Sequence, residues 1–319
     1  MSIELKQSKN NVEIIGLMKS VNFERKEIGN DRRLAMTGNA VIEVVDGDKV
    51  NNIRIDVFSF KLTKSGTENK IYKGFVTVAD EFKTIDKDGR DQADLVRVTG
   101  RLAGNAYVSD GELRESTRVN GTFFNRVEGE QEQSALAQLD LAINGFSDVV
   151  DADGVPTGVK KVDAFFVEYG NRISKVIGLE VSGELADQFG ELFSKGDTTE
   201  LTMKIQNYVT HVEDEKPVSG FGVQKQLGGG GSFTSNFEII GGTEAYMDGR
   251  EYTGEEFEAI LAGYEEMKKA KMADGGNSGI SKGSTNGFGT KTSGGGFGSA
   301  ATSNPFANAV TESNDDFAF

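Results

Sequence analysis

The first 128 residues alternate between apolar and polar positions in short segments that turn-forming residues separate. The segments with alternation or β-branched runs are residues 12–23, 33–45, 52–60, 71–78, 95–102 and 118–127. Gly, Asp and Asn are frequent between them, as is typical of strands joined by tight turns. The pattern therefore predicts five or six strands in a small closed barrel or a sandwich, with no clear long helix in this part of the chain.

A second set of strands follows, and it includes a predicted helix. Its strands are expected at residues 139–146, 159–169, 173–181, 201–209 and 232–240. Between the third and the fourth of these, Leu185, Phe189, Leu192 and Phe193 recur at helical spacing. Five strands with a helix between strands three and four resemble the oligonucleotide/oligosaccharide-binding (OB) fold. The first set lacks this helix in our interpretation, although 100–108 resembles 203–209, which favours duplication of one β module.

The pattern becomes helical again after residue 245 and then disappears. Thr253 and Glu256 have the spacing of a capping box, and an apolar stripe follows them, so we expect a helix that packs on the second barrel. Beyond it the chain is rich in Gly, Ser, Asn and Thr and cannot bury enough apolar surface to fold. The expected fold is mainly β, with two tandem OB-like β-barrels, a C-terminal helix and a disordered tail. The boundaries are 1–128 for the first barrel, 129–245 for the second, 246–272 for the helix and 273–319 for the tail.

Composition narrows the range of functions. Cysteine is absent and His211 is the only histidine, which removes disulfides, thiol nucleophiles, zinc clusters and any Ser-His triad not built on this residue. We expect no catalytic residues, no metal and no cofactor. No stretch is apolar enough to span a bilayer and the N-terminus lacks the apolar core of a signal peptide, so we expect a cytoplasmic protein without a membrane partner.

The net charge of −15 is unevenly distributed. Residues 1–128 hold 21 Lys and Arg against 20 Asp and Glu, which leaves 14 of the 35 basic and 30 of the 50 acidic residues for the rest of the chain. Phosphate contacts need Lys and Arg, so the first module is the one that could carry a basic face.

Strand alternation predicts such a face. In residues 52–60, Ile53, Ile55 and Val57 point to one side, and the residues that point to the other are Arg54, Asp56, Phe58 and Phe60. The same alternation elsewhere pairs Lys73 with Phe75, places Arg97 and Arg101 outward, and groups Arg118 with Phe124 and Arg126. Basic pairs flank a turn near residue 29. The candidate nucleic-acid-binding residues are Arg25, Arg32, Arg33, Arg54, Phe58, Phe60, Lys73, Phe75, Arg97, Arg101, Arg118, Phe124 and Arg126.

Aromatic and cationic side chains on one face suit single-stranded nucleic acid, because rings stack on bases of any sequence while Lys and Arg follow the phosphates. An alternative is that these phenylalanines cover a barrel end, pack on another domain or face a second sheet. The second module differs, with 19 acidic against 8 basic residues between 129 and 245. We expect its aromatic residues to be core: Phe165, Phe166, Tyr169, Tyr208, Phe233 and Phe237. The loop around Phe221 and Lys225 is either simply mobile or closes over a bound strand.

The end of the chain supplies a family resemblance. The Gly/Ser-rich stretch ends in S-N-D-D-F-A-F, where Asp315 and Asp316 precede Phe317 and Phe319. Together with the barrels, this layout resembles bacterial and bacteriophage single-stranded-DNA-binding proteins, whose tails end in acidic residues and a final aromatic residue. Phe317 and Ala318 stand where the bacterial tails have Ile and Pro. The resemblance implies sequence-independent binding and protection of single-stranded DNA in replication, recombination and repair. It also implies that the tail recruits replication or recombination proteins. The location would be the bacterial cytoplasm, which for a phage protein is that of the host.

Two other functions stay open at the level of sequence. One is a structural β-sandwich protein, for example of a phage particle, whose acidity keeps it soluble. The other is a carbohydrate-acting enzyme with paired carboxylates on a β scaffold.

Overall fold

The computed structural model describes residues 3–211 and 231–277, and its architecture is mainly β, as predicted. The strands are β1 (Asn10–Ile28), β2 (Arg33–Asp46), β3 (Lys49–Phe60), β4 (Leu95–Ser109), β5 (Glu112–Arg126), β6 (Ser134–Val150), β7 (Pro156–Glu168), β8 (Arg172–Lys175), β9 (Leu179–Ser182), β10 (Thr198–His211) and β11 (Gly231–Gly242). The helices are α1 (Lys70–Glu81), α2 (Ile85–Asp88), α3 (Glu184–Leu192) and α4 (Gly254–Asn277), with 3₁₀ turns η1 (Arg90–Gln92) and η2 (Tyr169–Asn171).

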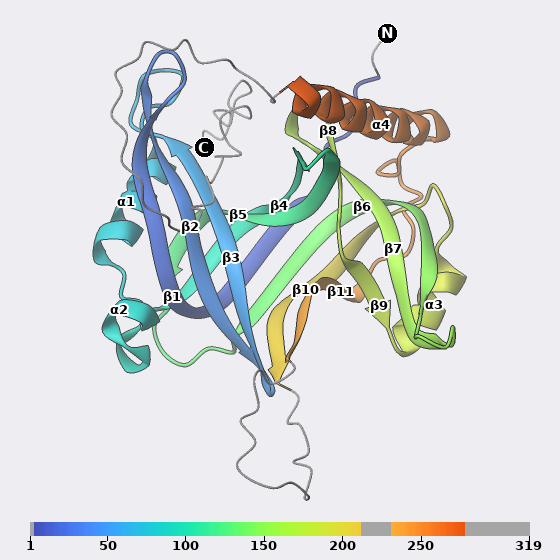
Figure 1. Cartoon of the computed structure of the whole chain (residues 1–319), viewed down its shortest axis with the longest axis horizontal. Helices are drawn as coiled ribbons and strands as arrows, with labels where there is room; N and C mark the ends of the chain where they lie inside the picture. Colours follow the sequence, from blue (N-terminus) through green and yellow to red (C-terminus); the bar gives the residue numbers. More distant parts are fainter. Residues whose placement is uncertain (1–2, 212–230, 278–319) are drawn as a thin grey trace, which may run out of the picture.

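Strands β1 to β5 close into a barrel (Figure 1). Antiparallel pairings join β1 to β2, β2 to β3, β4 to β5 and β1 to β4, and a parallel pairing of β3 with β5 completes the ring. Helices α1 and α2 lie in the chain between β3 and β4. This is the arrangement of an OB-like barrel.

The prediction of a strand at residues 71–78 is wrong, because this segment lies within α1. Tyr72, Phe75 and Val78 are the buried residues of the helix, and their spacing of three places them on one helical face. Asn69 caps the helix by accepting a hydrogen bond from the backbone N–H of Ile71 at 2.9 Å. The helix that the first strand set was expected to lack is therefore present.

The remaining strands continue the same sheet. The first half of β1 pairs antiparallel with β6, from Asn10 opposite Leu139 to Ile15 opposite Ser134. Pairings of β6 with β7, β7 with β9, β9 with β11, β11 with β10 and β10 with β6 form a further closed series, the second ring. Helix α3 follows β9, as expected for this part of the chain. The predicted third strand is divided into β8 and β9.

One hydrophobic cluster runs through both sets of strands. It includes Ile14 and Ile55 of the barrel together with Leu139, Phe166 and Met203 of the second ring, each at most 2% exposed. Both parts therefore share a continuous core, which the pairing of β1 with β6 holds in register.

The aromatic residues of the second ring only partly follow the prediction. Phe165, Phe166 and Phe237 are buried, as expected. Tyr169 and Phe233 are exposed, so their assignment to the core is wrong. Tyr208 is half-buried, with the Lys49 ammonium 4.9 Å from its ring centroid. The loop with Phe221 and Lys225 lies outside the described residues.

Helix α4 begins with the predicted capping box. The backbone N–H of Thr253 donates to Glu256 Oε2 at 2.7 Å, and the N–H of Glu256 donates to Thr253 Oγ1 at 3.2 Å. The helix packs on the second ring through a cluster that includes Phe165, Ile173 and Ile260. It also contacts the barrel, where the hydroxyl of Tyr264 donates to Glu115 of β5. None of the helices in residues 3–211 and 231–277 is long and apolar enough to cross a membrane. Asp315, Asp316, Phe317 and Phe319 lie outside the described residues, as do residues 278–319 as a whole.

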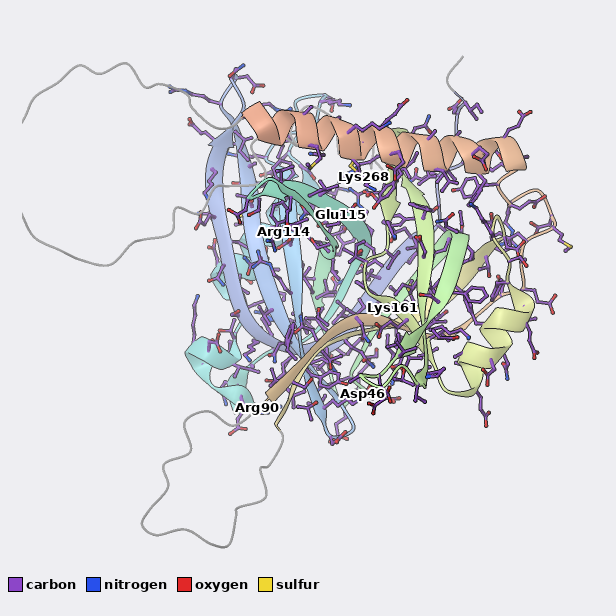
Figure 2. All side chains as sticks on the ribbon, turned by 45° about the vertical axis from the view of Figure 1, so that its right-hand side comes forward. Asp46, Arg90, Arg114, Glu115, Lys161 and Lys268 are labelled. Atoms are coloured by element: carbon purple, nitrogen blue, oxygen red, sulfur yellow. The ribbon has the colours of Figure 1, made fainter. Side chains whose placement is uncertain are left out.

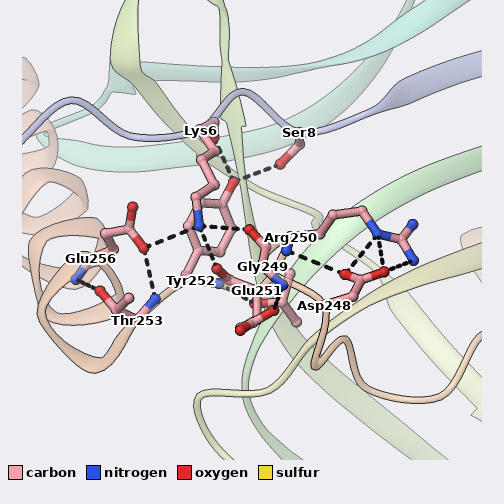
Figure 3. A network of polar contacts seen from close by, with 10 residues as sticks. Lys6, Ser8, Asp248, Gly249, Arg250, Glu251, Tyr252, Thr253 and Glu256 are labelled. Carbon is pink, nitrogen blue, oxygen red and sulfur yellow. Dashed lines mark hydrogen bonds and ion pairs between the residues drawn. The ribbon is translucent and has the colours of Figure 1, made fainter.

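The segment before α4 holds the N-terminal residues against the second ring (Figure 3). Lys6 Nζ donates to the carbonyl of Glu251 at 2.8 Å. The hydroxyl of Tyr252 donates to the carbonyl of Lys6 at 2.8 Å and lies 3.2 Å from Ser8 Oγ, which in turn accepts the N–H of Val167 at 3.0 Å. This network joins three distant parts of the chain.

Replacing Tyr252 with phenylalanine is expected to lower the free energy of unfolding by about 1–3 kcal/mol, because the Lys6 carbonyl and the buried Ser8 hydroxyl lose a partner. Burial raises the pKa of Tyr252 to about 12, whereas an unfolded tyrosine titrates at about 10. The contribution of the neutral side chain is therefore complete below pH 10 and is lost as the pH rises toward 12. Urea unfolding at pH 8 and pH 11 tests both points. Equal stability of the wild type and the variant at pH 8 would contradict the expected loss of hydrogen bonds. An equal loss of stability in both proteins on going from pH 8 to pH 11 would contradict the contribution of the raised Tyr252 pKa.

Candidate nucleic-acid interface

The predicted alternation of β3 is confirmed. Ile53, Ile55 and Val57 are buried in the barrel. On the outer face, the Arg54 side chain is 62% exposed, and Phe58 is half-buried. The strand thus presents cationic and aromatic side chains outward because consecutive residues point to opposite sides of the sheet.

An aromatic and cationic stack lies at the end of β3. The rings of Phe58 and Phe60 are 5.0 Å apart between centroids and meet edge to face at 82°. Arg33, the first residue of β2, places its guanidinium carbon 3.9 Å from the centroid of Phe60. The antiparallel register, with Ala35 opposite Phe60, brings these residues together. Guanidinium and ring hold one another by cation–π attraction while remaining partly accessible.

Two further arginines continue this face along β3 and β5. Arg54 Nε lies 2.9 Å and Arg118 Nη1 3.4 Å from the carboxylate of Asp56. Asp56 is buried, and the parallel pairing of β3 with β5 places it opposite Asn120. Two guanidinium groups therefore share one carboxylate, and these three side chains together carry one net positive charge. We call Arg33, Arg54, Phe58, Phe60 and Arg118 the β3 strip.

Two residues that the sequence interpretation did not select lie on the hairpin of β4 and β5. Tyr107 and Arg114 are directly opposite each other in the antiparallel register. Tyr107 is 42% exposed, and the Arg114 side chain is 53% exposed. Arg114 and Arg118 are four residues apart on one strand and therefore share its outer face. Extending the alternation of β5 toward its start identifies Arg114, which lies just before the strand predicted at residues 118–127.

The predicted pairing of Lys73 with Phe75 is wrong. Both residues lie on α1, where two positions are about 200° apart around the helix axis. Phe75 is 1% exposed and packs between Phe23 and Phe124, with centroids 5.8 Å and 6.0 Å away. Lys73 is exposed on the opposite side.

The predicted grouping of Arg118 with Phe124 and Arg126 is also wrong. The register of β4 and β5 shifts between Thr99, opposite Phe123, and Gly100, opposite Gly121, so Thr122 is an extra residue. Such a β-bulge reverses the alternation. Phe124 consequently faces the barrel end, opposite buried Val98, and packs on α1.

The other basic candidates form separate contacts. Arg126 Nε lies 2.9 Å from Asp94, and its guanidinium lies over Phe82. Arg25 makes an ion pair with Asp80 of α1 at 3.0 Å. Arg97 donates to Gln131 at 3.0 Å. Partly buried Arg101 lines a small pocket with Ser8 and Tyr169, and burial lowers its pKa. Arg32 is exposed in the turn between β1 and β2, next to Arg33 of the strip.

Within the part of the chain that the structure describes, no group of three or more His, Cys, Asp or Glu side chains could hold a metal ion. The aromatic rings and guanidinium groups of the β3 strip suit a ligand that carries both flat apolar groups and negative charge.

A family model described as YorF matches residues 9–274. No curated protein matches the chain. The wild-type single-stranded DNA binding protein from Thermus aquaticus has a TM-score of 0.48 at 14% sequence identity, covering 78% of this chain and 99% of that one. A deletion mutant of that protein has a TM-score of 0.45 at 14% identity and the same coverage. A replication protein A heterotrimer bound to ssDNA has a TM-score of 0.18 at 12% identity, covering 63% of this chain and 45% of that one.

Proposed function

The chain belongs to the YorF family, and we propose that it binds single-stranded DNA without sequence preference and performs no chemistry on it. The observation that carries the proposal is the stack of Arg33 on Phe60, with Phe58 edge-on beside it, on the outer face of strands β2 and β3. OB-folds bind oligonucleotides across strands two and three and through the loops that flank them. The β3 strip occupies that position.

The chemistry of the strip favours a single strand. Unpaired bases expose flat faces that stack on aromatic rings, each stacked base contributing about 1–3 kcal/mol. Arg54 and Arg118 would meet phosphates beside the rings, and the ion pairs of both guanidinium groups with Asp56 support a defined spacing between them. A double helix hides its base faces, so the aromatic part of the strip would be unused.

We also propose a division of labour along the chain. The first module, residues 1–128, would bind most of the DNA, and the second ring would be a second OB-like barrel, at 129–245, with weaker affinity for phosphate because it is acidic. The predicted tail at 273–319, of which residues 273–277 belong to α4, would recruit replication, recombination or repair proteins in the cytoplasm. There Asp315 and Asp316 would meet basic residues of a partner while Phe319 fills an apolar pocket.

The salt dependence of binding tests the proposal. If the first module neutralises four phosphates, the logarithm of the affinity should fall with the logarithm of salt concentration at a slope of about −3, since each phosphate contributes about −0.7 for single strands. Fluorescence anisotropy of labelled oligothymidine at several salt concentrations measures this slope. A duplex of equal length and an oligouridine are the controls for strand and sugar preference. Absence of binding at low salt would remove the proposal and direct attention to assembly as a structural protein.

A further inference from the structure

We infer that the second ring and α4 contribute to strand binding indirectly, by holding the hairpin that carries Tyr107 and Arg114. This hairpin, residues 103–117, is here called the β4–β5 arm. Glu115 of the arm and Tyr264 of α4 are the positioning residues. The inference rests on the proposed function. It adds a role in DNA binding for the second ring and α4, whose acidic composition argues against direct contact with DNA.

The β4–β5 arm extends beyond the strand pairings of the barrel. Strand β4 pairs with β1 only from Leu95 to Gly100, and β5 pairs with β3 only at Val119 and Asn120. Beyond these limits, among the strands that the structure describes, β4 and β5 pair with each other alone. An isolated two-stranded hairpin is marginally stable in water, so the arm needs contacts from elsewhere to keep one position.

The two faces of the arm have different neighbours. Arg114, with Tyr107 opposite, lies on the exposed face. Glu115 points to the other face, where its carboxylate accepts a hydrogen bond from Tyr264 at 2.5 Å. Figure 2 shows Arg114 and Glu115 on the arm beneath α4. Because neighbouring residues of a strand point to opposite faces, Arg114 lies on the face that we propose meets DNA, and Glu115 lies on the face that contacts α4.

Strand β7 of the second ring, together with β8 and the turn after it, holds the base of the arm. The N–H of Gly104 donates to Glu168 at 3.1 Å, and Arg172 donates to the Gly104 carbonyl at 2.5 Å. Across the hairpin, the N–H of Ile177 donates to Thr117 Oγ1 at 2.8 Å. A Cβ atom at Gly104 would overlap Ser174, so this close approach requires glycine.

Tyr264 is well suited to a fixed contact. Its side chain is 5% exposed and packs edge-on against Phe165 at 4.9 Å. Burial and the hydrogen bond to Glu115 raise the pKa of Tyr264, so its hydroxyl stays a donor at neutral pH. The tyrosine thus links the core under α4 directly to the arm.

The test is the Tyr264→Phe variant of the full chain, which keeps the ring and removes the hydroxyl. We expect its affinity for labelled oligothymidine to fall about five-fold, the lower end of coupling between distant sites. Hydrogen exchange of the amides in residues 103–117 should become faster, while exchange in β2 and β3 stays unchanged. Tyr252→Phe is the matched control, since it removes a buried tyrosine hydroxyl whose partners are Lys6 and Ser8 rather than the arm, and it should leave affinity and arm exchange unchanged.

A double-mutant cycle with Tyr107→Ala separates positioning from a general loss of stability. If the arm is held for the sake of Tyr107, Tyr264→Phe should cost little further affinity in the Tyr107→Ala background. Faster arm exchange with full affinity would show that the strand does not use the arm, and unchanged exchange would show that α4 does not hold it. Either result overturns the inference while wild-type binding keeps the proposed function intact. Absence of wild-type binding overturns both.

Discussion

The double substitution Phe58→Ala and Phe60→Ala is expected to weaken binding of single-stranded oligothymidine by about 30-fold or more. Each ring that stacks on a base contributes about 1–3 kcal/mol, and about 1.4 kcal/mol corresponds to a factor of ten in affinity. The two rings contact each other edge to face, and Arg33 lies over one of them. Removing both therefore also leaves the Arg33 guanidinium without its aromatic support. Fluorescence anisotropy at constant salt concentration measures the loss.

The matched control for this variant is Phe146→Ala on the second ring. The side chain of Phe146 also meets another phenylalanine edge to face, with its ring centroid 5.7 Å from that of Phe189. It also has a cation nearby, since Lys160 Nζ lies 6.0 Å from the Phe146 centroid. It differs from the β3 strip in its location, within the acidic module of residues 129–245. Equal loss of affinity in the two variants would mean that the strip is not the main contact. Unchanged affinity in the double variant, with an unchanged circular dichroism spectrum, would contradict the proposed interface.

The substitution Phe75→Ala is expected to lower the free energy of unfolding by about 3–5 kcal/mol, as is usual for a fully buried phenylalanine. The side chain is 1% exposed and fills the space between Phe23 and Phe124, where α1 packs on the barrel. The alanine variant would leave a cavity at this contact and lose two aromatic pairs. Urea unfolding followed by circular dichroism measures the change.

Lys73→Ala is the control on the same helix. Its side chain is exposed, so we expect a change in stability within about 0.5 kcal/mol. Phe75→Ala should bind oligothymidine normally under conditions where it is folded, because its ring faces the core. A stable Phe75→Ala variant with reduced affinity would contradict this assignment and return Phe75 to the binding surface.

The amino-acid sequence by itself determined those features whose cause is local. Alternation placed Ile53, Ile55 and Val57 inside and Arg54, Phe58 and Phe60 outside, and both assignments agree with the structure. The capping box predicted the start of α4 because its two hydrogen bonds join residues only three positions apart. A strand period of two and a helix cap need no knowledge of distant residues.

Tertiary structure decided the features that depend on distant partners. Residues 71–78 contain several β-branched residues and resemble a strand, but Tyr72, Phe75 and Val78 gain burial only as one face of a helix on the barrel. The β-bulge at Thr122 reverses the sides of β5. Gly121 beside it is typical of a bulge, but the register against β4 determines that the extra residue is there.

The candidate interface also depends on residues that are distant in the sequence. Arg33 meets Phe60 only through the register of β2 and β3, and Tyr107 meets Arg114 only through that of β4 and β5. Tyr264 reaches Glu115 across 149 positions of the chain. Periodicity shows which side of a strand a residue occupies, whereas the pairing of strands and the packing of α4 determine which residues from separate segments form one surface.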